Sequence, residues 1–186
     1  MNIFKSLTPR ATAIVAVVLV LALPGLGQAG QAPPPIPAPP SASLPPSISL
    51  GEARVIIDGA LAYARQRGTL MAVAVVDQAG NVVSSDRMDG ASFANTQYAE
   101  AKAFASVISR QTTQTLSELA KDRPDRYFGI INMYPGKVYL VGGGVPLIVN
   151  GQLVGAVGVA GLAQYEDEAA GRQGIAAGER FRANRR

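Results

Sequence analysis

The chain has 186 residues, of which 48% are hydrophobic and 16% are charged, a composition that predicts a globular protein with enough apolar material for one domain. It contains no cysteine, so its stability must come from packing or assembly, and no histidine, which removes the commonest general base, metal ligand and haem axial ligand. The net charge is +4, but the sequence lacks the pattern of aromatic and basic residues that is typical of nucleic-acid-binding proteins. Nucleic acid is therefore not an expected partner.

Residues 1–29 have the pattern of a cleavable signal peptide. Lys5 and Arg10 precede an uninterrupted apolar run over residues 11–23, and Gly27 to Ala29 offers the small-x-small pattern that signal peptidase reads. We expect cleavage after Ala29 and a periplasmic or secreted protein. The alternative is an uncleaved N-terminal membrane anchor, but the apolar run is short for a permanent anchor. We therefore expect no membrane span after processing.

A proline-rich linker follows over residues 30–48, with eight prolines between Pro33 and Pro46. Such a segment favours extended polyproline II structure and behaves as a semi-rigid spacer. A docking motif is the alternative, but no aromatic or charged residue decorates the segment. A folded domain is predicted over residues 49–180, followed by a frayed basic tail over residues 181–186.

The domain opens with a predicted helix followed by two strands. Ser49 and Glu52 form a capping box, and the apolar periodicity that follows ends near Gly68. Residues 71–76 are a continuous apolar run that predicts a strand buried on both faces. A turn over residues 77–81 leads to a second strand over residues 82–87.

A long helix is predicted over residues 92–110, where apolar residues recur at spacings of three and four. Thr112, Thr113 and Thr115 are expected to break it, and a short helix is expected over residues 116–121. Residues 122–136 are predicted to be mostly loop, because they contain two prolines and two glycines.

The last third predicts a β-hairpin and a closing helix. Strands over residues 145–149 and 153–159 flank Asn150-Gly151, the pair typical of a type I′ turn. Gly155 and Gly158 inside the second strand indicate bulges or close backbone contact. The closing helix is expected from Gln164 to about Gly178. Hairpins in place of βαβ crossovers predict an antiparallel sheet flanked by helices.

Three glycines before the hairpin have two interpretations. Gly143 and Gly144, with Gly142, would let backbone N–H groups converge on a carboxylate or phosphate. The segment lacks the Gly-Lys-Ser/Thr ending of a P-loop, and no helix is predicted directly after it. A structural turn is therefore the favoured interpretation, and an anion site is the alternative.

Charged residues give little support for catalysis. Arg87, Asp89 and Lys102 flank a predicted strand-to-helix junction where ligand sites often lie, although Arg87 and Asp89 would also suit a solvated turn. The acids at 166–168 open the closing helix, where they offset its dipole. Without histidine or cysteine, a nucleophile would need lysine or a carboxylate as its base, and no Ser-x-x-Lys motif surrounds Lys102. No enzymatic activity is predicted.

Four segments together resemble the GlcG/HbpS-like haem-binding family: RMDGA at 87–91, AEAKA at 99–103, GGVPL at 143–147 and GQLVGAVGV at 151–159. The resemblance covers roughly residues 50–178. It implies an α/β domain of profilin-like layout, with a mostly antiparallel five-stranded sheet surrounded by helices. It also implies assembly into homo-oligomers and, for exported members, a role as a haem-binding or redox-sensing accessory.

The resemblance implies haem as a cofactor, but without the histidine through which related domains on cobalamin-modifying enzymes bind it. Haem iron would then meet tyrosine, methionine, lysine or threonine, or no strong protein ligand. An exported family member uses threonine. The residues considered as iron ligands are Tyr98, Thr112, Thr113, Met133 and Tyr134, while Arg87 and Lys102 would pair with haem propionates.

Three functions follow as hypotheses. The first is an exported, non-catalytic haem-binding accessory or sensor. The second is a module that binds a small carboxylate such as a hydroxy acid, suggested by the glycolate-operon naming of the family and by the glycine segment. The third is a purely structural oligomer.

Overall fold

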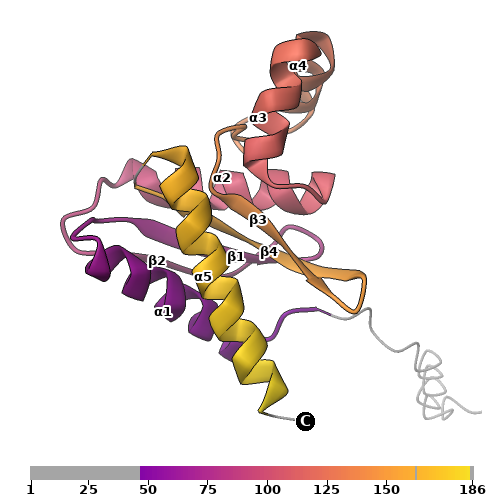
Figure 1. The fold of residues 1–186 in the computed structure, drawn as a ribbon. Helices are drawn as coiled ribbons and strands as arrows, with labels where there is room; N and C mark the ends of the chain where they lie inside the picture. Colours follow the sequence, from indigo (N-terminus) through magenta and orange to yellow (C-terminus); the bar gives the residue numbers. More distant parts are fainter. Residues whose placement is uncertain (1–46, 162, 185–186) are drawn as a thin grey trace, which may run out of the picture. The chain divides into compact units, whose positions relative to one another are not determined.

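The computed structural model describes residues 47–161 and 163–184, which belong to the unit of the chain that begins at Ser41 (Figure 1). The predicted signal peptide and residues 30–46 of the predicted linker lie outside the described residues. No helix in the described part is both long and apolar enough to cross a bilayer.

The described residues form one antiparallel sheet of four strands. The strands are β1 (Ala72–Asp77), β2 (Val82–Arg87), β3 (Gly144–Val149) and β4 (Gln152–Ala160), in the order β2-β1-β4-β3. All three neighbouring pairs are antiparallel, so the predicted sheet type is confirmed. The prediction of five strands is wrong, because Val138 and Leu140 pack against a small helical cluster and do not join the sheet.

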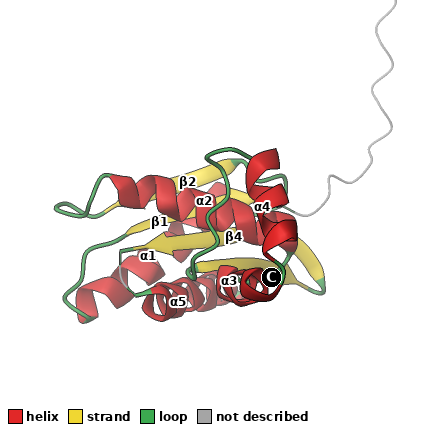
Figure 2. Ribbon diagram, turned by 90° about the horizontal axis from the view of Figure 1, so that it is seen from above, coloured by secondary structure: helices red, strands yellow, loops and turns green. Residues whose placement is uncertain are grey.

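Different helices cover the two faces of the sheet. Helices α1 (Leu50–Gln66) and α5 (Gln164–Ala183) pack on one face, and helix α2 (Ala94–Ser109) packs on the other (Figure 2). The face toward α1 and α5 buries valines of β1 and β4. The face toward α2 presents mainly alanine, which lets that helix approach the strands closely.

Gly158 shows how close this approach is. A Cβ at this position would overlap the carbonyl oxygen of Ala99 and lie 2.6 Å from the nitrogen of Ala103. The predicted close backbone contact is therefore confirmed. A bulge next to Gly155, where the pairing of β3 with β4 shifts between Leu147 and Ile148, confirms the other expectation for these glycines.

The short-range signals of the sequence are confirmed in large part. The hydroxyl of Ser49 accepts a hydrogen bond from the backbone N–H of Glu52 at 3.2 Å and caps α1, which is one half of the predicted capping box. The carboxylate of Glu52 pairs instead with Arg182. Asn150 and Gly151 have φ angles of 50° and 76°, as a type I′ turn requires.

The β1–β2 turn is organised by Asp77. Its carboxylate accepts hydrogen bonds from the backbone N–H groups of Ala79 and Asn81, and from the side-chain amide of Asn81. Burial by itself would raise the pKa of Asp77, but these hydrogen bonds outweigh it and hold the pKa below its usual value. The carboxylate therefore stays charged and fixes the turn that carries Gly80.

Two helices follow α2 where the sequence predicted one short helix and a loop. Helix α3 (Thr113–Asp122) begins earlier than expected, because Thr112 caps it and does not merely break α2: its hydroxyl accepts from the N–H of Thr115. Helix α4 (Pro124–Met133) was not predicted. Its proline occupies the first helical turn, where the missing N–H costs nothing, and Gly129 faces open space.

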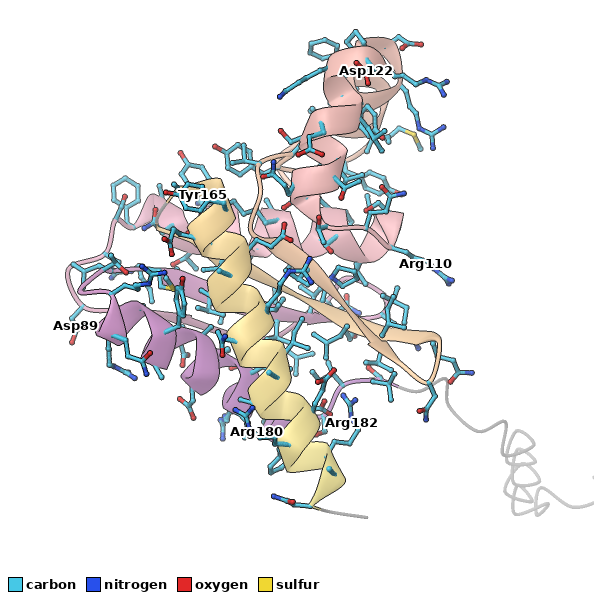
Figure 3. The ribbon with its side chains drawn as sticks, in the orientation of Figure 1. Asp89, Arg110, Asp122, Tyr165, Arg180 and Arg182 are labelled. Atoms are coloured by element: carbon cyan, nitrogen blue, oxygen red, sulfur yellow. The ribbon has the colours of Figure 1, made fainter. Side chains whose placement is uncertain are left out.

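Helix α5 extends to Ala183, beyond the predicted end near Gly178. The glycines of this helix serve packing: a Cβ on Gly174 would overlap the carbonyl oxygen of Ile56 in α1. Arg182, which was assigned to a frayed tail, lies on the last turn of α5 (Figure 3). It forms an ion pair with Glu52 of α1. The tail prediction is therefore wrong up to residue 184.

Candidate functional site

A buried ion pair joins the two layers of helices. The ammonium group of Lys102 in α2 lies 2.8 Å from a carboxylate oxygen of Asp167 in α5 and donates to the carbonyl oxygen of Val159 in β4 at 2.9 Å. The two residues are only 2% and 1% exposed. The pair therefore ties α2 to α5 around the end of β4, and it gives Lys102 a partner other than a haem propionate.

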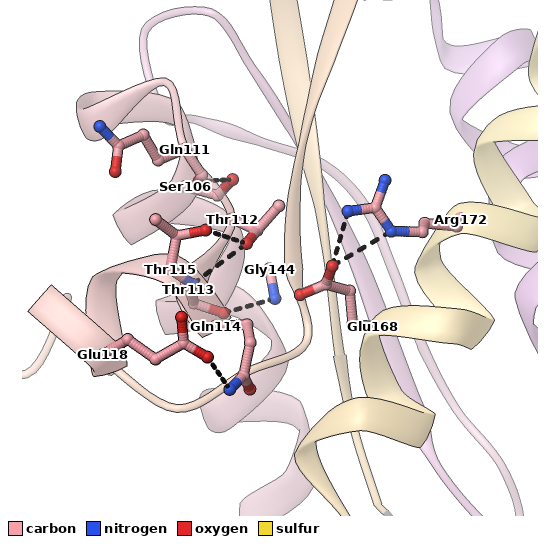
Figure 4. Close-up of polar contacts among 10 residues, drawn as sticks. All are labelled: Ser106, Gln111, Thr112, Thr113, Gln114, Thr115, Glu118, Gly144, Glu168 and Arg172. Atoms are coloured by element: carbon pink, nitrogen blue, oxygen red, sulfur yellow. Dashed lines mark hydrogen bonds and ion pairs between the residues drawn. The ribbon is translucent and has the colours of Figure 1, made fainter.

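The glycine segment closes around this ion pair. A Cβ on Gly143 would lie 2.8 Å from the Cβ of Asp167 and 3.0 Å from the ammonium nitrogen of Lys102. The backbone N–H of Gly144 donates to the hydroxyl of Thr113 at 2.7 Å (Figure 4). The N–H that the anion-site hypothesis would use at Gly144 is thus already engaged, and the geometry favours the structural interpretation.

These contacts bring five sequence positions together from distant parts of the chain: Lys102, Thr113, Gly143, Gly144 and Asp167. Four of them were predicted as site residues, but the structure joins them as a packed polar cluster inside the domain. Asp167 was missed, because its place in the first turn of a helix has an adequate explanation in the helix dipole.

Tyr98 and Thr112 lie outside this cluster. The Tyr98 side chain is 43% exposed, and its ring stacks on Tyr139 with a centroid distance of 5.0 Å. The hydroxyl of Thr112 is engaged as the cap of α3 and lies 3.1 Å from the hydroxyl of Thr115 (Figure 4).

Arg87 is also separate. Its guanidinium group donates to the carbonyl oxygen of Ala91 at 2.5 Å, and the residue is exposed. It lines a shallow hollow with Leu61 and Arg65 of α1. Arg87 and Lys102, both predicted as propionate partners, have different neighbours in the described part of the chain. The two residues therefore do not share one site.

The remaining two predicted residues, Met133 and Tyr134, border a cavity of about 370 Å³ that we call the α2–α4 cavity. This volume lies within the range of about 300–1,000 Å³ that small-molecule sites occupy. Its walls come from the end of α2, from α3 and α4, and from the segment before β3. The apolar lining consists of Ala105, Ile108, Leu116, Ile130, Val138 and Leu140.

Donor groups are set into this apolar lining. Tyr127 is 7% exposed and belongs to the small core that α3 and α4 build against α2. The ring of Tyr134 makes an edge contact with Phe104 of α2, with centroids 5.3 Å apart, which holds it at the wall. Met133 is 73% exposed at the end of α4. Arg126 supplies the positive charge of the lining.

The chemistry of this donor set suits a large flat apolar ligand that carries a metal and carboxylates. Tyrosine oxygen and methionine sulfur are both used as axial haem ligands, and a guanidinium group pairs well with a carboxylate. No group of three or more acidic, histidine or cysteine side chains that would hold a bare metal ion occurs in the described part of the chain. Arg126 and Tyr127 were missed because helix α4 was predicted as loop.

Sequence comparison places the chain in a known family. Residues 48–176 match the family model described as Haem degrading protein HbpS-like. An uncharacterised 15.0 kDa protein encoded in the dhaT–dhaS intergenic region of Citrobacter freundii is 30% identical over 121 residues, which make up 65% of this chain and 84% of that protein.

Two solved structures share the fold. A double mutant of HbpS from Streptomyces reticuli superposes with a TM-score of 0.69 at 28% identity, over 79% of this chain and 97% of that one. A PduOC:haem complex superposes with a TM-score of 0.64 at 27% identity, over 70% of this chain and 94% of that one.

Proposed function

Because the chain belongs to the HbpS-like family of haem-degrading proteins, we propose that its domain binds haem in the α2–α4 cavity without a histidine ligand. The observation that carries the proposal is the apolar cavity with Met133, Tyr134 and Arg126 in its lining. A similar fold carries haem in the PduOC complex, which supports the ligand class.

Tyr134 is the proposed iron ligand. Of the five residues considered from the sequence, only Met133 and Tyr134 border the cavity, whereas Thr113 is engaged by Gly144. Tyr134 is held against Phe104, while Met133 is largely exposed and less fixed. A residue whose ring is already positioned loses less conformational entropy when it binds.

Arg126 is the proposed partner of a haem propionate. It lies in the first turns of α4 and borders the same cavity as Tyr134. Arg87 and Lys102, which the sequence suggested for this role, are engaged elsewhere in the structure by Ala91 and Asp167. A guanidinium group at the rim fits a ligand whose carboxylates point toward solvent.

The proposed role is that of an exported haem-binding accessory or sensor without catalysis of its own. Among the described residues that line the cavity there is no carboxylate and no imidazole, so no strong general base faces the ligand. Haemin bound to the protein should therefore lose its Soret absorbance under ascorbate and oxygen no faster than haemin bound to serum albumin. Faster loss would favour a haem-degrading enzyme.

Haemin titration of the processed protein tests the proposal. We expect a shifted Soret band that saturates at one haemin per domain. Ile108→Glu should weaken binding roughly tenfold or more, because it places a charge at the edge of the apolar lining. The matched control is Ile148→Glu on β3, since both isoleucines are partly exposed, at 40% and 53%.

Two outcomes of this titration would contradict the proposal. The first is absorbance that rises without saturation, which indicates non-specific association of haemin. The second is equal weakening by Ile108→Glu and Ile148→Glu, which would place the ligand outside the cavity.

Export is part of the same proposal and rests on the sequence of residues 1–29. Expression with the full leader in a bacterium should yield a mature protein that begins at Gly30 and is released with the periplasmic fraction. Intact-mass measurement checks the cut. A protein that retains Met1 to Ala29 in the membrane fraction would show an uncleaved anchor.

The mature protein is also proposed to assemble with copies of itself. Three apolar residues of α4 are exposed, with values of 66%, 37% and 73% for Phe128, Ile131 and Met133, and exposed apolar side chains are typical of protein contact sites. Light scattering that gives the mass of a monomer at micromolar concentration would contradict this. No carboxylate-binding function is proposed for the glycine segment, because Gly144 donates its N–H to Thr113.

A further inference from the structure

A second hollow is lined by Phe104, the residue whose ring contacts Tyr134. It has a volume of about 530 Å³ and runs between α2, the β1–β2 turn and the segment just after α4. We call it the α2–β2 groove. Its walls include Gln97, Glu100 and Phe104 of α2, Val82 of β2, and Lys137. None of these residues lines the α2–α4 cavity, so the groove is a separate feature.

The floor of the groove is a fixed aromatic ring. A Cβ on Gly80 would lie 2.7 Å from Cδ2 and Cε2 of Phe104, so the turn backbone packs against one edge of that ring. The edge contact with Tyr134, with ring centroids 5.3 Å apart, also holds the ring in place. Val76 and Val82 extend the apolar surface, and Val82 is 50% exposed. A preformed flat apolar surface of this kind suits an aromatic side chain of a ligand.

A negative and a positive side chain lie next to the Phe104 ring. Glu100 lies one helical turn before Phe104 on the same face of α2, and the ammonium group of Lys137 lies 5.9 Å from the centre of the Phe104 ring. Neither side chain forms an ion pair with any described residue. The groove therefore offers a carboxylate and an ammonium group that are not neutralised by each other.

We infer that the α2–β2 groove binds a free α-amino acid with an aromatic side chain. Lys137 would pair with the ligand's carboxylate, Glu100 with its ammonium group, and Phe104 with its ring. The two protein charges are complementary to a zwitterion, whereas a plain carboxylate would leave Glu100 facing a second negative charge. Gln97 at the rim adds a neutral donor and acceptor.

Calorimetric titration of the haem-free protein with L-phenylalanine tests this inference. Two matched probes each lack one charge of the amino acid: 3-phenylpropanoate lacks the ammonium group, and phenethylamine lacks the carboxylate. We expect saturable binding of L-phenylalanine, and binding of either probe that is about tenfold weaker, as the loss of one charged hydrogen bond predicts.

Charge-removing variants assign the partners. Glu100→Gln should weaken L-phenylalanine and phenethylamine while it leaves 3-phenylpropanoate unchanged or tighter. Lys137→Met should weaken L-phenylalanine and 3-phenylpropanoate but not phenethylamine. The matched controls are Glu118→Gln and Lys121→Met, two exposed residues of α3 that line neither hollow and should leave all three affinities unchanged.

Three results would overturn the inference. They are the absence of saturable binding for all three compounds, a preference for 3-phenylpropanoate over L-phenylalanine, and equal effects of the groove variants and the α3 controls. The haemin spectrum of Glu100→Gln and Lys137→Met is expected to match that of the unmodified protein. If the protein failed to bind haemin, the amino-acid inference would therefore still hold. If it failed to bind L-phenylalanine, the haem proposal would still hold.

Discussion

Replacing Tyr134 by phenylalanine is expected to weaken haemin binding roughly a hundredfold or more, since even changes around the ligands of a metal cost about 10–100-fold in affinity. The variant keeps the ring that packs on Phe104 and removes only the phenol oxygen proposed to meet the iron. The fold should therefore be unaffected. Absorbance and resonance Raman spectra of the ferric complex measure the loss of the phenolate-to-iron charge-transfer signal.

Two further variants make this result specific. Tyr139→Phe changes a tyrosine that stacks on Tyr98 and does not line the α2–α4 cavity, so its haemin complex should match that of the unmodified protein. Met133→Leu keeps the size of the side chain and removes the thioether. Wild-type spectra for Tyr134→Phe together with a lost Soret shift for Met133→Leu would transfer the ligand role to Met133.

Replacing Lys102 by methionine is expected to lower the free energy of unfolding by about 3–5 kcal/mol, the usual consequence of removing one partner of a buried ion pair. The carboxylate of Asp167 would remain in an environment where the residue is only 1% exposed. It would lose the contact at 2.8 Å that ties α5 to α2. Urea unfolding followed by circular dichroism measures the change.

The controls for this prediction use a surface pair and a double variant. Arg172→Met breaks an ion pair with Glu168 in which the arginine is exposed and the carboxylate is partly buried, and it should cost less than about 1 kcal/mol. Lys102→Met combined with Asp167→Leu should recover most of the loss, because no charge is then left buried. If Lys102→Met lowers the free energy of unfolding no more than Arg172→Met does, the buried ion pair does not stabilise the packing of α2 with α5. Folded Lys102→Met protein should still bind haemin.

The elements that sequence reasoning predicted well are those fixed by near neighbours. Ser49 and Glu52 are three residues apart, and the cap they predict is present. Asn150-Gly151 adopts the predicted turn, because its two positive φ angles are a property of those residues themselves. The strand at residues 72–77 is buried as expected from its continuous apolar run.

The elements that were missed depend on contacts across the chain. Pro124 and Gly129 signal a loop in isolation, yet a proline is compatible with the first turn of α4, and the helix is stabilised by packing Tyr127 against Leu116. The same packing draws Val138 away from the sheet, so the fifth strand expected from the family resemblance is absent among the described residues.

The candidate site was predicted in part for the same reason. Met133 and Tyr134 were named on residue chemistry alone, and both border the α2–α4 cavity. Lys102 and Thr113 were named as ligand contacts, but the structure engages them with Asp167 and Gly144. Asp167 was not predicted because the position of α2 decides which face of α5 is buried. The charge pattern at residues 166–168 is local and does not show which of the three acids faces α2.

The architecture explains why the proposed haem site lies where it does. Small alanines and glycines let α2 pack closely on β1 and β4, as the overlap of a Cβ on Gly158 with the carbonyl oxygen of Ala99 shows. The end of α2 extends to α3 and α4, which build a separate small core around Leu116 and Tyr127. The junction between the two cores is the place where apolar space remains beside aromatic donors.

The most direct test of the proposed haem site is a crystal structure of the haemin complex with an anomalous difference map at the iron edge. We expect one iron peak per domain inside the α2–α4 cavity, within bonding distance of the phenol oxygen of Tyr134. An iron peak in the α2–β2 groove, at the Tyr98–Tyr139 stack or on the outer surface of α4 would contradict it.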